Sequence, residues 1–138
     1  MNVPDASTRP SARLLFIEDD AGLAAIVVRH LRALGHDARS VESAEDAVEL
    51  LASGYRPTVV LLDINLPGAS GWDLLRGGAL RAAGSPPVYL VTATTVAPAR
   101  LREFQIAGLL PKPFAMPTLV DVVERACGVG VAGTEELE

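Results

Sequence analysis

Five short apolar runs, often β-branched, recur along the chain and constrain its fold more than any other feature. They cover residues 14–17, 38–41, 59–62, 88–91 and, more weakly, 109–110. Each run has the length of a buried strand, and segments with helical spacing separate the runs. Strands that alternate with helices in this way pair in parallel and are covered on both faces. The pattern therefore predicts an α/β protein built on a five-stranded parallel sheet.

The first two helices have recognisable ends. An apolar face that includes Ile26 predicts a first helix, and Gly35 follows it as a stop signal. Ser43 with Asp46 three residues later is typical of a capping box. We expect this second helix to bury Val48.

The later helices are marked by proline and interrupted by glycine. Pro98 and Pro117 suit the first turns of the last two of five expected helices. The third helical pattern contains Gly77 and Gly78, and each glycine costs about 1 kcal/mol relative to alanine inside a helix. We expect this third helix to be short, bent or frayed at the glycines.

Polar side chains stand at the carboxyl ends of the expected strands. They are Glu18, Asp19 and Asp20 after the first strand, Asp63 after the third, Thr92 after the fourth and Lys112 after the fifth. Ligands of open α/β sheets bind beyond these ends, so the acids, the hydroxyl and the amine are candidates for one site. Each also has an ordinary structural explanation, and Asp20 is equally suited to cap the first helix.

Several carboxylates at one edge predict a bound cation. Such groups repel one another, and either a raised pKa or a cation relieves the repulsion. An all-oxygen cluster without histidine or cysteine suits a hard ion, Mg²⁺ above all. A carboxylate beside this ion can attack phosphorus to form an aspartyl phosphate, and Asp63 is the candidate. Lys112 would add a second positive charge and the Thr92 hydroxyl a hydrogen bond.

Four motifs resemble the signatures of response-regulator receiver domains. They are FIEDD at 16–20, LLDINLPG at 61–68, LVTA at 90–93 and PKPF at 111–114, in the order and spacing common in that family. The resemblance covers about residues 13–127. It implies a flavodoxin-like, doubly wound fold with strand order 2-1-3-4-5 and five helices. It also implies a single-domain response regulator that takes a phosphoryl group on Asp63 from a histidine kinase or phosphotransfer protein.

The resemblance further implies a set of metal ligands. Asp19 and Asp63 would bind Mg²⁺ directly, and Glu18 would act through a bound water. The backbone carbonyl of Asn65 would complete the protein ligands.

In such domains the threonine and the lysine contact the phosphoryl group, which implies this role for Thr92 and Lys112. The resemblance also favours a cis Lys112–Pro113 bond, well above the base rate of roughly 5–6%. The chain departs from the family at Leu109, where a tyrosine or phenylalanine commonly reports phosphorylation. We therefore expect the signal to leave through residues 93–98 and the helix that follows.

Other functions share parts of this pattern. Aspartyl-phosphate phosphatases need a second aspartate two residues after the nucleophile, where this chain has Asn65. A flavin mononucleotide protein of the same fold would need a phosphate-binding loop after its first strand, and the acids there would repel a phosphate. A receiver-like adaptor that is never phosphorylated usually lacks an acid or the lysine, and this chain lacks neither. The adaptor is the main alternative to a phosphorylated switch. The switch itself would not be an enzyme that turns over an external substrate.

Composition limits the partners and the location. The chain has 138 residues, the size of one domain. Its net charge is −5 and its basic residues are scattered, which argues against direct nucleic-acid binding. Its apolar runs are too short to span a membrane, and its polar start lacks the features of a signal peptide. We expect a cytoplasmic protein whose output is a changed surface for a downstream target protein.

The expected organisation leaves a few side chains outside the site. Residues 1–12 are predicted to be a disordered lead-in, 13–127 the receiver domain and 128–138 a flexible acidic tail. We expect His30 and His36 on the surface, Trp72 partly exposed and Cys127 as a small core residue.

Overall fold

The centre of the fold is a parallel sheet of five strands in the order β2-β1-β3-β4-β5. A computed structural model describes residues 11–66, 68 and 70–127. The strands are β1 (Arg13–Ile17), β2 (Asp37–Val41), β3 (Val59–Asp63), β4 (Val88–Thr92) and β5 (Gly108–Pro111). All neighbouring strands pair in parallel. The predicted sheet and its strand order are confirmed.

The described residues form six helices, where the sequence predicts five. They are α1 (Ala21–Ala33), α2 (Ala44–Ala52), α3 (Gly71–Arg76), α4 (Ala79–Ala82), α5 (Pro98–Glu103) and α6 (Met116–Ala126). The additional helix arises where a weak third helix is predicted. Gly77 has an extended backbone with φ −71° and ψ 177°, which ends α3 and lets α4 begin one residue after Gly78.

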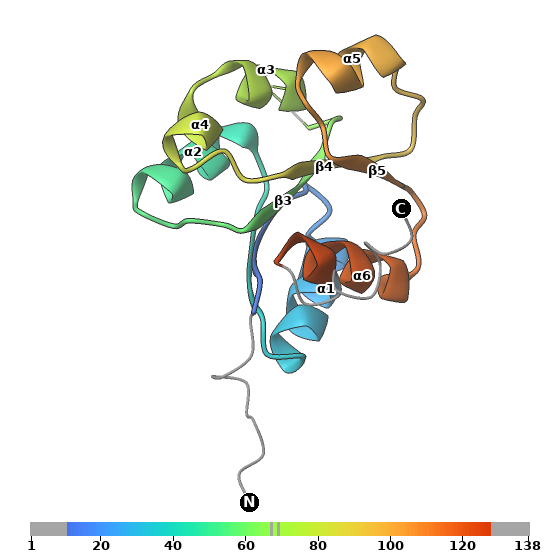
Figure 1. The fold of residues 1–138 in the computed structure, drawn as a ribbon. Helices are drawn as coiled ribbons and strands as arrows, with labels where there is room; N and C mark the ends of the chain where they lie inside the picture. Colours follow the sequence, from blue (N-terminus) through green and yellow to red (C-terminus); the bar gives the residue numbers. More distant parts are fainter. Residues whose placement is uncertain (1–10, 67, 69, 128–138) are drawn as a thin grey trace, which may run out of the picture.

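The helices cover both faces of the sheet, as Figure 1 shows. α1 and α6 lie on one face, and α2, α3, α4 and α5 lie on the other. Within β1, Leu14 and Phe16 belong to the core under α1 and α6, whereas Leu15 and Ile17 belong to the opposite core. Alternate residues of a strand point to opposite faces, so a strand covered on both sides must be apolar throughout. This requirement explains the uninterrupted apolar runs.

Side-chain caps fix the helix starts next to the sheet. The Leu23 N–H donates to Asp20 Oδ1 at 3.1 Å, so Asp20 caps α1. The Asp46 N–H donates to Ser43 Oγ at 3.0 Å, which confirms Ser43 as the N-cap of α2 but supplies only one of the two bonds of the predicted capping box. Both prolines predicted at helix starts lie in the first turns of α5 and α6.

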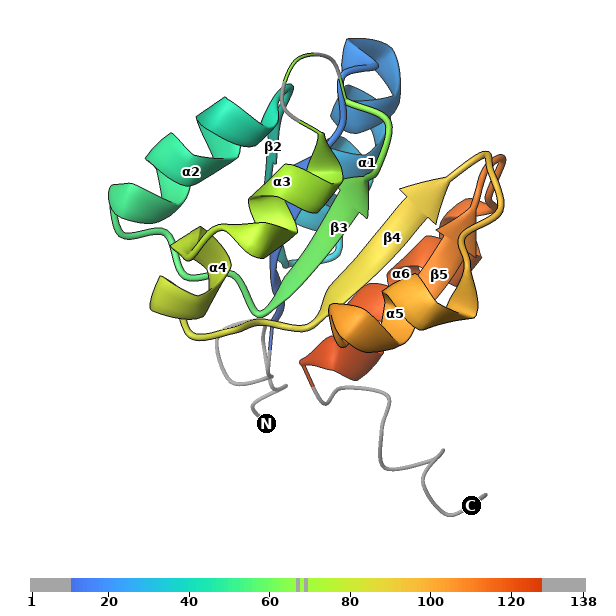
Figure 2. The same cartoon turned by 90° about the horizontal axis from the view of Figure 1, so that it is seen from above.

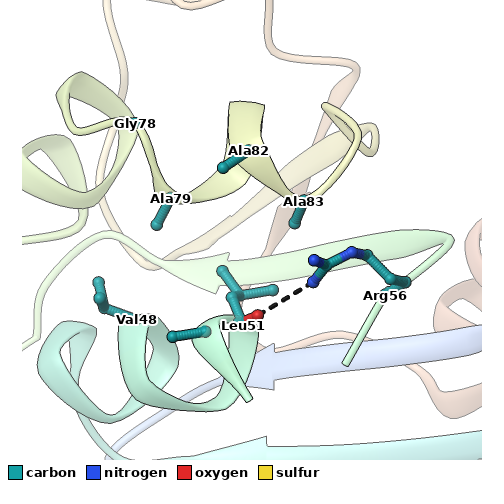
Figure 3. Close-up of a pocket in the computed structure, with 8 residues that line it drawn as sticks. Val48, Leu51, Arg56, Gly78, Ala79, Ala82 and Ala83 are labelled. Carbon is teal, nitrogen blue, oxygen red and sulfur yellow. Dashed lines mark hydrogen bonds between the residues drawn. The ribbon is translucent and has the colours of Figure 1, made fainter. Parts of the chain in front are cut away.

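Three apolar side chains that the sequence places on buried helix faces are exposed, and one of them is Leu34 at the C-cap of α1, which is 47% exposed. Ile26 on α1 is 56% exposed and Val48 on α2 is 44% exposed. Val48 borders a groove of about 370 Å³ between α2 and α4, which Figure 3 shows from the side. The groove stays open because its other walls are mostly small: Ala52, Gly78, Ala79, Ala82 and Ala83. At one end Arg56 Nη1 donates to the Leu51 carbonyl at 3.0 Å.

His36 is buried, so its predicted surface position is wrong. The Ala12 N–H donates to His36 Nδ1 at 3.0 Å, and His36 Nε2 lies 3.1 Å from Glu124 Oε2 on α6. A backbone N–H can only donate, so Nδ1 accepts and Nε2 carries the proton that faces Glu124. The ring joins the start of β1 to α6. His30 is exposed, as predicted.

Parts of the predicted organisation lie outside the described residues. This holds for residues 1–10 of the lead-in and for the tail, 128–138. Ala12, at the end of the predicted lead-in, is fully buried. Cys127 is partly buried and packs against the core under α1 and α6. Among the helices in the described ranges, none combines the length and apolarity that a membrane crossing requires.

Candidate functional site

The carboxyl ends of four strands bring the candidate residues to one edge of the sheet. Glu18 directly follows β1, Asp63 and Thr92 end β3 and β4, and Lys112 directly follows β5. The ends of β3 and β4 lie side by side in Figure 2. Glu18, Asp63 and Thr92 are only 1%, 5% and 3% exposed. Polar groups buried this deeply require partners.

Three carboxylates form a compact cluster. One oxygen from each of Glu18, Asp19 and Asp63 lies within 4.8 Å of the other two. Glu18 and Asp63 are buried, whereas Asp19 is exposed to solvent. The structure thus brings together three of the acids that the sequence places at the strand ends. Asp20 instead points its carboxylate at the start of α1.

Lys112 joins the two buried acids. Its Nζ lies 2.8 Å from Glu18 Oε1 and 3.1 Å from Asp63 Oδ2. Lys112 contacts two of the three carboxylates, so the cluster as a whole has more negative than positive charge. This contact of Lys112 with Glu18 is not predicted from the sequence.

The pKa values of Glu18 and Lys112 show how the charges of the site are balanced. Burial raises the pKa of Glu18 above its ordinary value and the charge of Asp63 adds to this, although contacts with Lys112 and the Asp20 N–H act in the opposite direction. Burial alone would lower the pKa of Lys112, but its contacts with Glu18 and Asp63 outweigh burial and raise it. The two shifts agree, because Lys112 faces two acids while Glu18 faces one cation and a second acid. A further cation would relieve this imbalance.

The donor set of this cluster fits a hard divalent cation. The candidate ligand atoms are carboxylate oxygens, which Mg²⁺ prefers over nitrogen or sulfur. Glu18 Oε1 is buried, and its one polar side-chain partner in the described residues is Lys112 Nζ at 2.8 Å. This oxygen retains capacity for another positive partner.

Backbone contacts fix Asp63 at the centre of the site. Its Oδ1 accepts a hydrogen bond from the Asn65 N–H at 2.9 Å, and its Oδ2 faces Lys112. Gly71, at the start of α3, lies so close that an added Cβ would be 2.8 Å from Ile64 Cδ1 and 3.2 Å from the Asp63 carbonyl oxygen. The role of Gly71 is not predicted from the sequence, where its only signal is its position directly after a serine that can cap a helix. Its lack of a side chain lets α3 pack behind Asp63.

The Thr92 hydroxyl is turned toward its own loop. The Thr94 N–H donates to Thr92 Oγ1 at 2.9 Å, and the two hydroxyl oxygens lie 3.0 Å apart. The Lys112 N–H donates to the Thr92 carbonyl at 2.9 Å, which ties the end of β4 to the lysine. Thr92 thus lies at the predicted edge of the sheet, and its hydroxyl is hydrogen-bonded to Thr94 in the following loop.

The peptide bond that follows Lys112 has the geometry that the resemblance implies. The Lys112–Pro113 peptide bond is cis. Leu109, on β5, is 40% exposed and pairs with Leu90 of β4. Trp72 is partly exposed, as predicted, and its ring centre lies 5.3 Å from that of Phe104. The aromatic pair joins α3 to the end of α5.

Sequence comparisons identify relatives along nearly the whole chain. Residues 14–124 match the family described as the response regulator receiver domain. Protein Rrf1 of Nitratidesulfovibrio vulgaris is 33% identical over 130 residues, which cover 91% of this chain and 89% of Rrf1. Response regulator protein FleR of Pseudomonas aeruginosa is also 33% identical, over 129 residues. This match covers 91% of the chain but only 27% of FleR.

Solved structures agree with the sequence matches. The non-phosphorylated receiver domain of HemR from Leptospira biflexa has a TM-score of 0.70 at 28% identity, with 86% of this chain and 95% of HemR covered. The receiver domain of sensor histidine kinase PA1611 from Pseudomonas aeruginosa has a TM-score of 0.71 at 24% identity, with coverage of 86% and 98%. That PA1611 structure has a magnesium ion coordinated in its active site cleft, and at this identity it supports the fold alone. Together, the family match, the relatives and the strand order show that this chain belongs to the response regulator receiver domain family.

Proposed function

We propose that this chain is a phosphorylation switch in which Asp63 accepts a phosphoryl group from a phosphohistidine of a histidine kinase or phosphotransfer protein. The observation that carries the proposal is the position of Asp63. Its carboxylate lies between Lys112 and a backbone N–H, inside a cluster of acids that fits Mg²⁺. A receiver-like adaptor would not require this arrangement. A phosphatase would require an acid at Asn65.

The proposed metal ligands surround Asp63. Asp19, Asp63 and the backbone carbonyl of Asn65 would bind Mg²⁺ directly, and Glu18 would bind it through a water molecule. When bound, the ion would neutralise charge on the phosphoryl oxygens. Glu18 supports a nearby cation, because burial raises its pKa and its buried Oε1 has Lys112 as its one positive partner.

The transfer step assigns a role to each polar side chain. An oxygen of Asp63 attacks the phosphorus and forms a P–O bond. The P–N bond to the donor's histidine breaks, and its electron pair remains on the imidazole nitrogen. Lys112 Nζ pairs with the negative charge of the phosphoryl group, and the Thr92 hydroxyl donates a hydrogen bond to one of its oxygens.

Phosphorylation would change a surface that binds a downstream target protein. Leu109 offers no aromatic ring, so we propose that movement of Thr92 passes to residues 93–98 and then to α5. Phosphorylation can bias only an equilibrium between two conformations that are already close in energy. In this proposal residues 13–127 are a complete switch without turnover of an external substrate. A cytoplasmic location and the lack of direct nucleic-acid binding stay predictions.

Amide spectra with beryllofluoride, a phosphoryl mimic, test this function. In the presence of Mg²⁺ we expect shifts around Asp63, Thr92 and Lys112, with further shifts in residues 93–103. The matched control is Asp63→Asn, which has the same shape without the nucleophile and should show no mimic-dependent shifts. Binding of Mg²⁺ without any response to beryllofluoride or to a phosphorylated kinase would favour the adaptor instead. Shifts confined to the site would contradict the proposed route through α5.

A further inference from the structure

A hollow lined by three arginines lies at the edge of the sheet opposite the candidate site. This arginine hollow has a volume of about 370 Å³, and Arg13, Asp37, Arg39, Tyr55 and Arg56 are among its walls. Arg13 and Asp37 begin β1 and β2, and Tyr55 and Arg56 lie in the connection from α2 to β3. These are the amino ends of the strands, whereas the candidate site lies at their carboxyl ends. The arginine hollow is therefore separate from the chemistry proposed for Asp63.

The arginine hollow is positively charged in a chain whose net charge is −5. Its three arginines are exposed and share one acid, Asp37, whose Oδ1 lies 3.8 Å from Arg39 Nε. Arg13 Nε donates to the Arg56 carbonyl at 2.7 Å, and Arg56 Nη1 donates to the Tyr55 carbonyl at 3.1 Å. An arginine has five N–H donors, so both side chains are held in place and still have donors for an acidic ligand.

The arginine hollow continues into the apolar groove between α2 and α4. Arg56 lines both, and Ala52 of the groove directly precedes Ser53 of the hollow. Figure 3 shows Arg56 at one end of the groove and Val48 at the other. Val48 is 44% exposed and faces walls that are mostly alanine and glycine, which leaves space for one apolar side chain. The combined surface fits a segment in which acids lie next to an apolar residue.

Residues 134–138 of the same chain, TEELE, have this composition and lie outside the described residues. The described part reaches Cys127, at the C-cap of α6. Glu124 of α6 lies 3.1 Å from His36, the residue before Asp37, so α6 ends near the arginine hollow. The seven residues 128–134 extend by up to about 25 Å, which is enough to bring the glutamates from the end of α6 to the hollow.

We propose that residues 134–138 dock on this surface, with their glutamates at the arginine hollow and Leu137 in the apolar groove. Residues 1–10 also adjoin the hollow, but they contain one acid and one base and lack the complementary charge. Each exposed ion pair is weak, yet the short connection gives the segment an effective concentration on the order of mM. Docking would cover Val48 and join α2 to α4.

A spin label next to the segment measures the docking in the full chain. Gly133→Cys in a Cys127→Ala background carries the label, and we expect it to broaden the amide signals of Arg39, Gly54 and Ala82. Glu135→Gln/Glu136→Gln/Glu138→Gln should lower the ratio of docked to free molecules about tenfold, because three weak ion pairs are lost. The broadening should then disappear. About 0.5 M NaCl should have the same effect on the labelled parent chain, because salt screens exposed charges.

Two further variants test the specificity of the contact. Glu42→Gln/Glu45→Gln/Asp46→Asn removes the same charge from exposed acids at the opposite end of α2 from the hollow, and it should leave the broadening unchanged. Leu137→Ala should shift the amide signals of Val48 and Ala82 in the unlabelled chain, because it removes the apolar side chain proposed for the groove. The remaining amide signals of each variant show whether its fold is intact.

Broadening that disappears with the three segment glutamates and persists in the control at the start of α2 supports the docking. Broadening that is absent in the labelled parent, or that survives the loss of those glutamates, overturns it. A labelled chain that broadens the signals of an unlabelled, isotope-enriched copy would indicate contact between two copies and would also overturn docking within one chain. The experiment uses neither Mg²⁺ nor a phosphoryl mimic, so its outcome is independent of the function proposed for Asp63.

Discussion

Replacement of Asp19 by asparagine should have opposite effects on stability and on metal binding. Asp19 is exposed and makes no ion pair within the described residues, so the change removes one charge without breaking a contact. Like charges 4.8 Å apart repel by about 0.9 kcal/mol at a dielectric constant of 80 and about 3.5 kcal/mol at 20. The exposure of Asp19 favours the lower figure. Asp19 is repelled by Glu18 and by Asp63 and is attracted by Lys112. Together these interactions destabilise the folded protein by about 1 kcal/mol.

In buffer with a chelator, we therefore expect Asp19→Asn to be about 1 kcal/mol more stable than the wild type. For a domain of this size that difference raises the Tm by about 4 °C. Added Mg²⁺ should reverse the order. A ligand at about 100 times its Kd stabilises the folded state by about 2.7 kcal/mol, and the variant has lost one ligand group.

Thermal unfolding followed by circular dichroism across a Mg²⁺ series measures both effects. Asp20→Asn is the matched control, because it removes the neighbouring charge while asparagine still caps α1. This control should keep the wild-type response to Mg²⁺. A lower Tm for Asp19→Asn in chelator, or a full response of that variant to Mg²⁺, would refute the charge balance derived from the structure.

Three further substitutions test other contacts. Lys112→Met leaves two buried carboxylates without their cation, and we expect urea unfolding in chelator to show a loss of about 3 kcal/mol; an unchanged midpoint would contradict the ion pairs. Gly71→Ala should shift the amide signals of residues 63–65 and lower the Tm, because the new Cβ would lie 2.8 Å from Ile64 Cδ1; spectra like those of the wild type would contradict this close packing. Tyr55, between α2 and β3, is buried, and its hydroxyl donates to the Leu14 carbonyl at 2.9 Å. Burial raises the pKa of Tyr55 to about 12 from 10.0, so the neutral ring contributes stability that is complete below pH 10 and is lost as the pH rises through 12. The tyrosinate absorbance of the wild type minus that of Tyr55→Phe should show this late titration, and a midpoint near 10 would contradict it.

The sheet and the location of the site are predictable because both follow from short-range patterns. Each strand is a continuous apolar run, and a parallel sheet places the residues after its strands at one edge. The acids, Asp63, Thr92 and Lys112 are therefore predictable as neighbours. The strand order and the cis bond before Pro113 come from the family resemblance, since the spacing of the runs alone does not set them.

The features that the sequence does not predict depend on distant or geometric contacts. His36 is held in its buried position by contacts with Ala12 and Glu124, which lie 24 and 88 positions away in the chain. Val48 is exposed because α4 is short and offers mainly alanine and glycine opposite it. The contact of Lys112 with Glu18 depends on how β1 and the end of β5 face each other. The Thr92–Thr94 contact is local, and a hydroxyl two residues after another is its signal.

Intact mass after incubation with acetyl phosphate is the most direct test of phosphorylation at Asp63. The wild type in Mg²⁺ should gain one phosphoryl mass, and peptide mapping should place it on Asp63. Removal of Mg²⁺ or the Asp63→Asn substitution should abolish the gain. A phosphoryl group on another residue, or an equal gain by Asp63→Asn, would contradict the assignment of Asp63 as the phosphoryl acceptor.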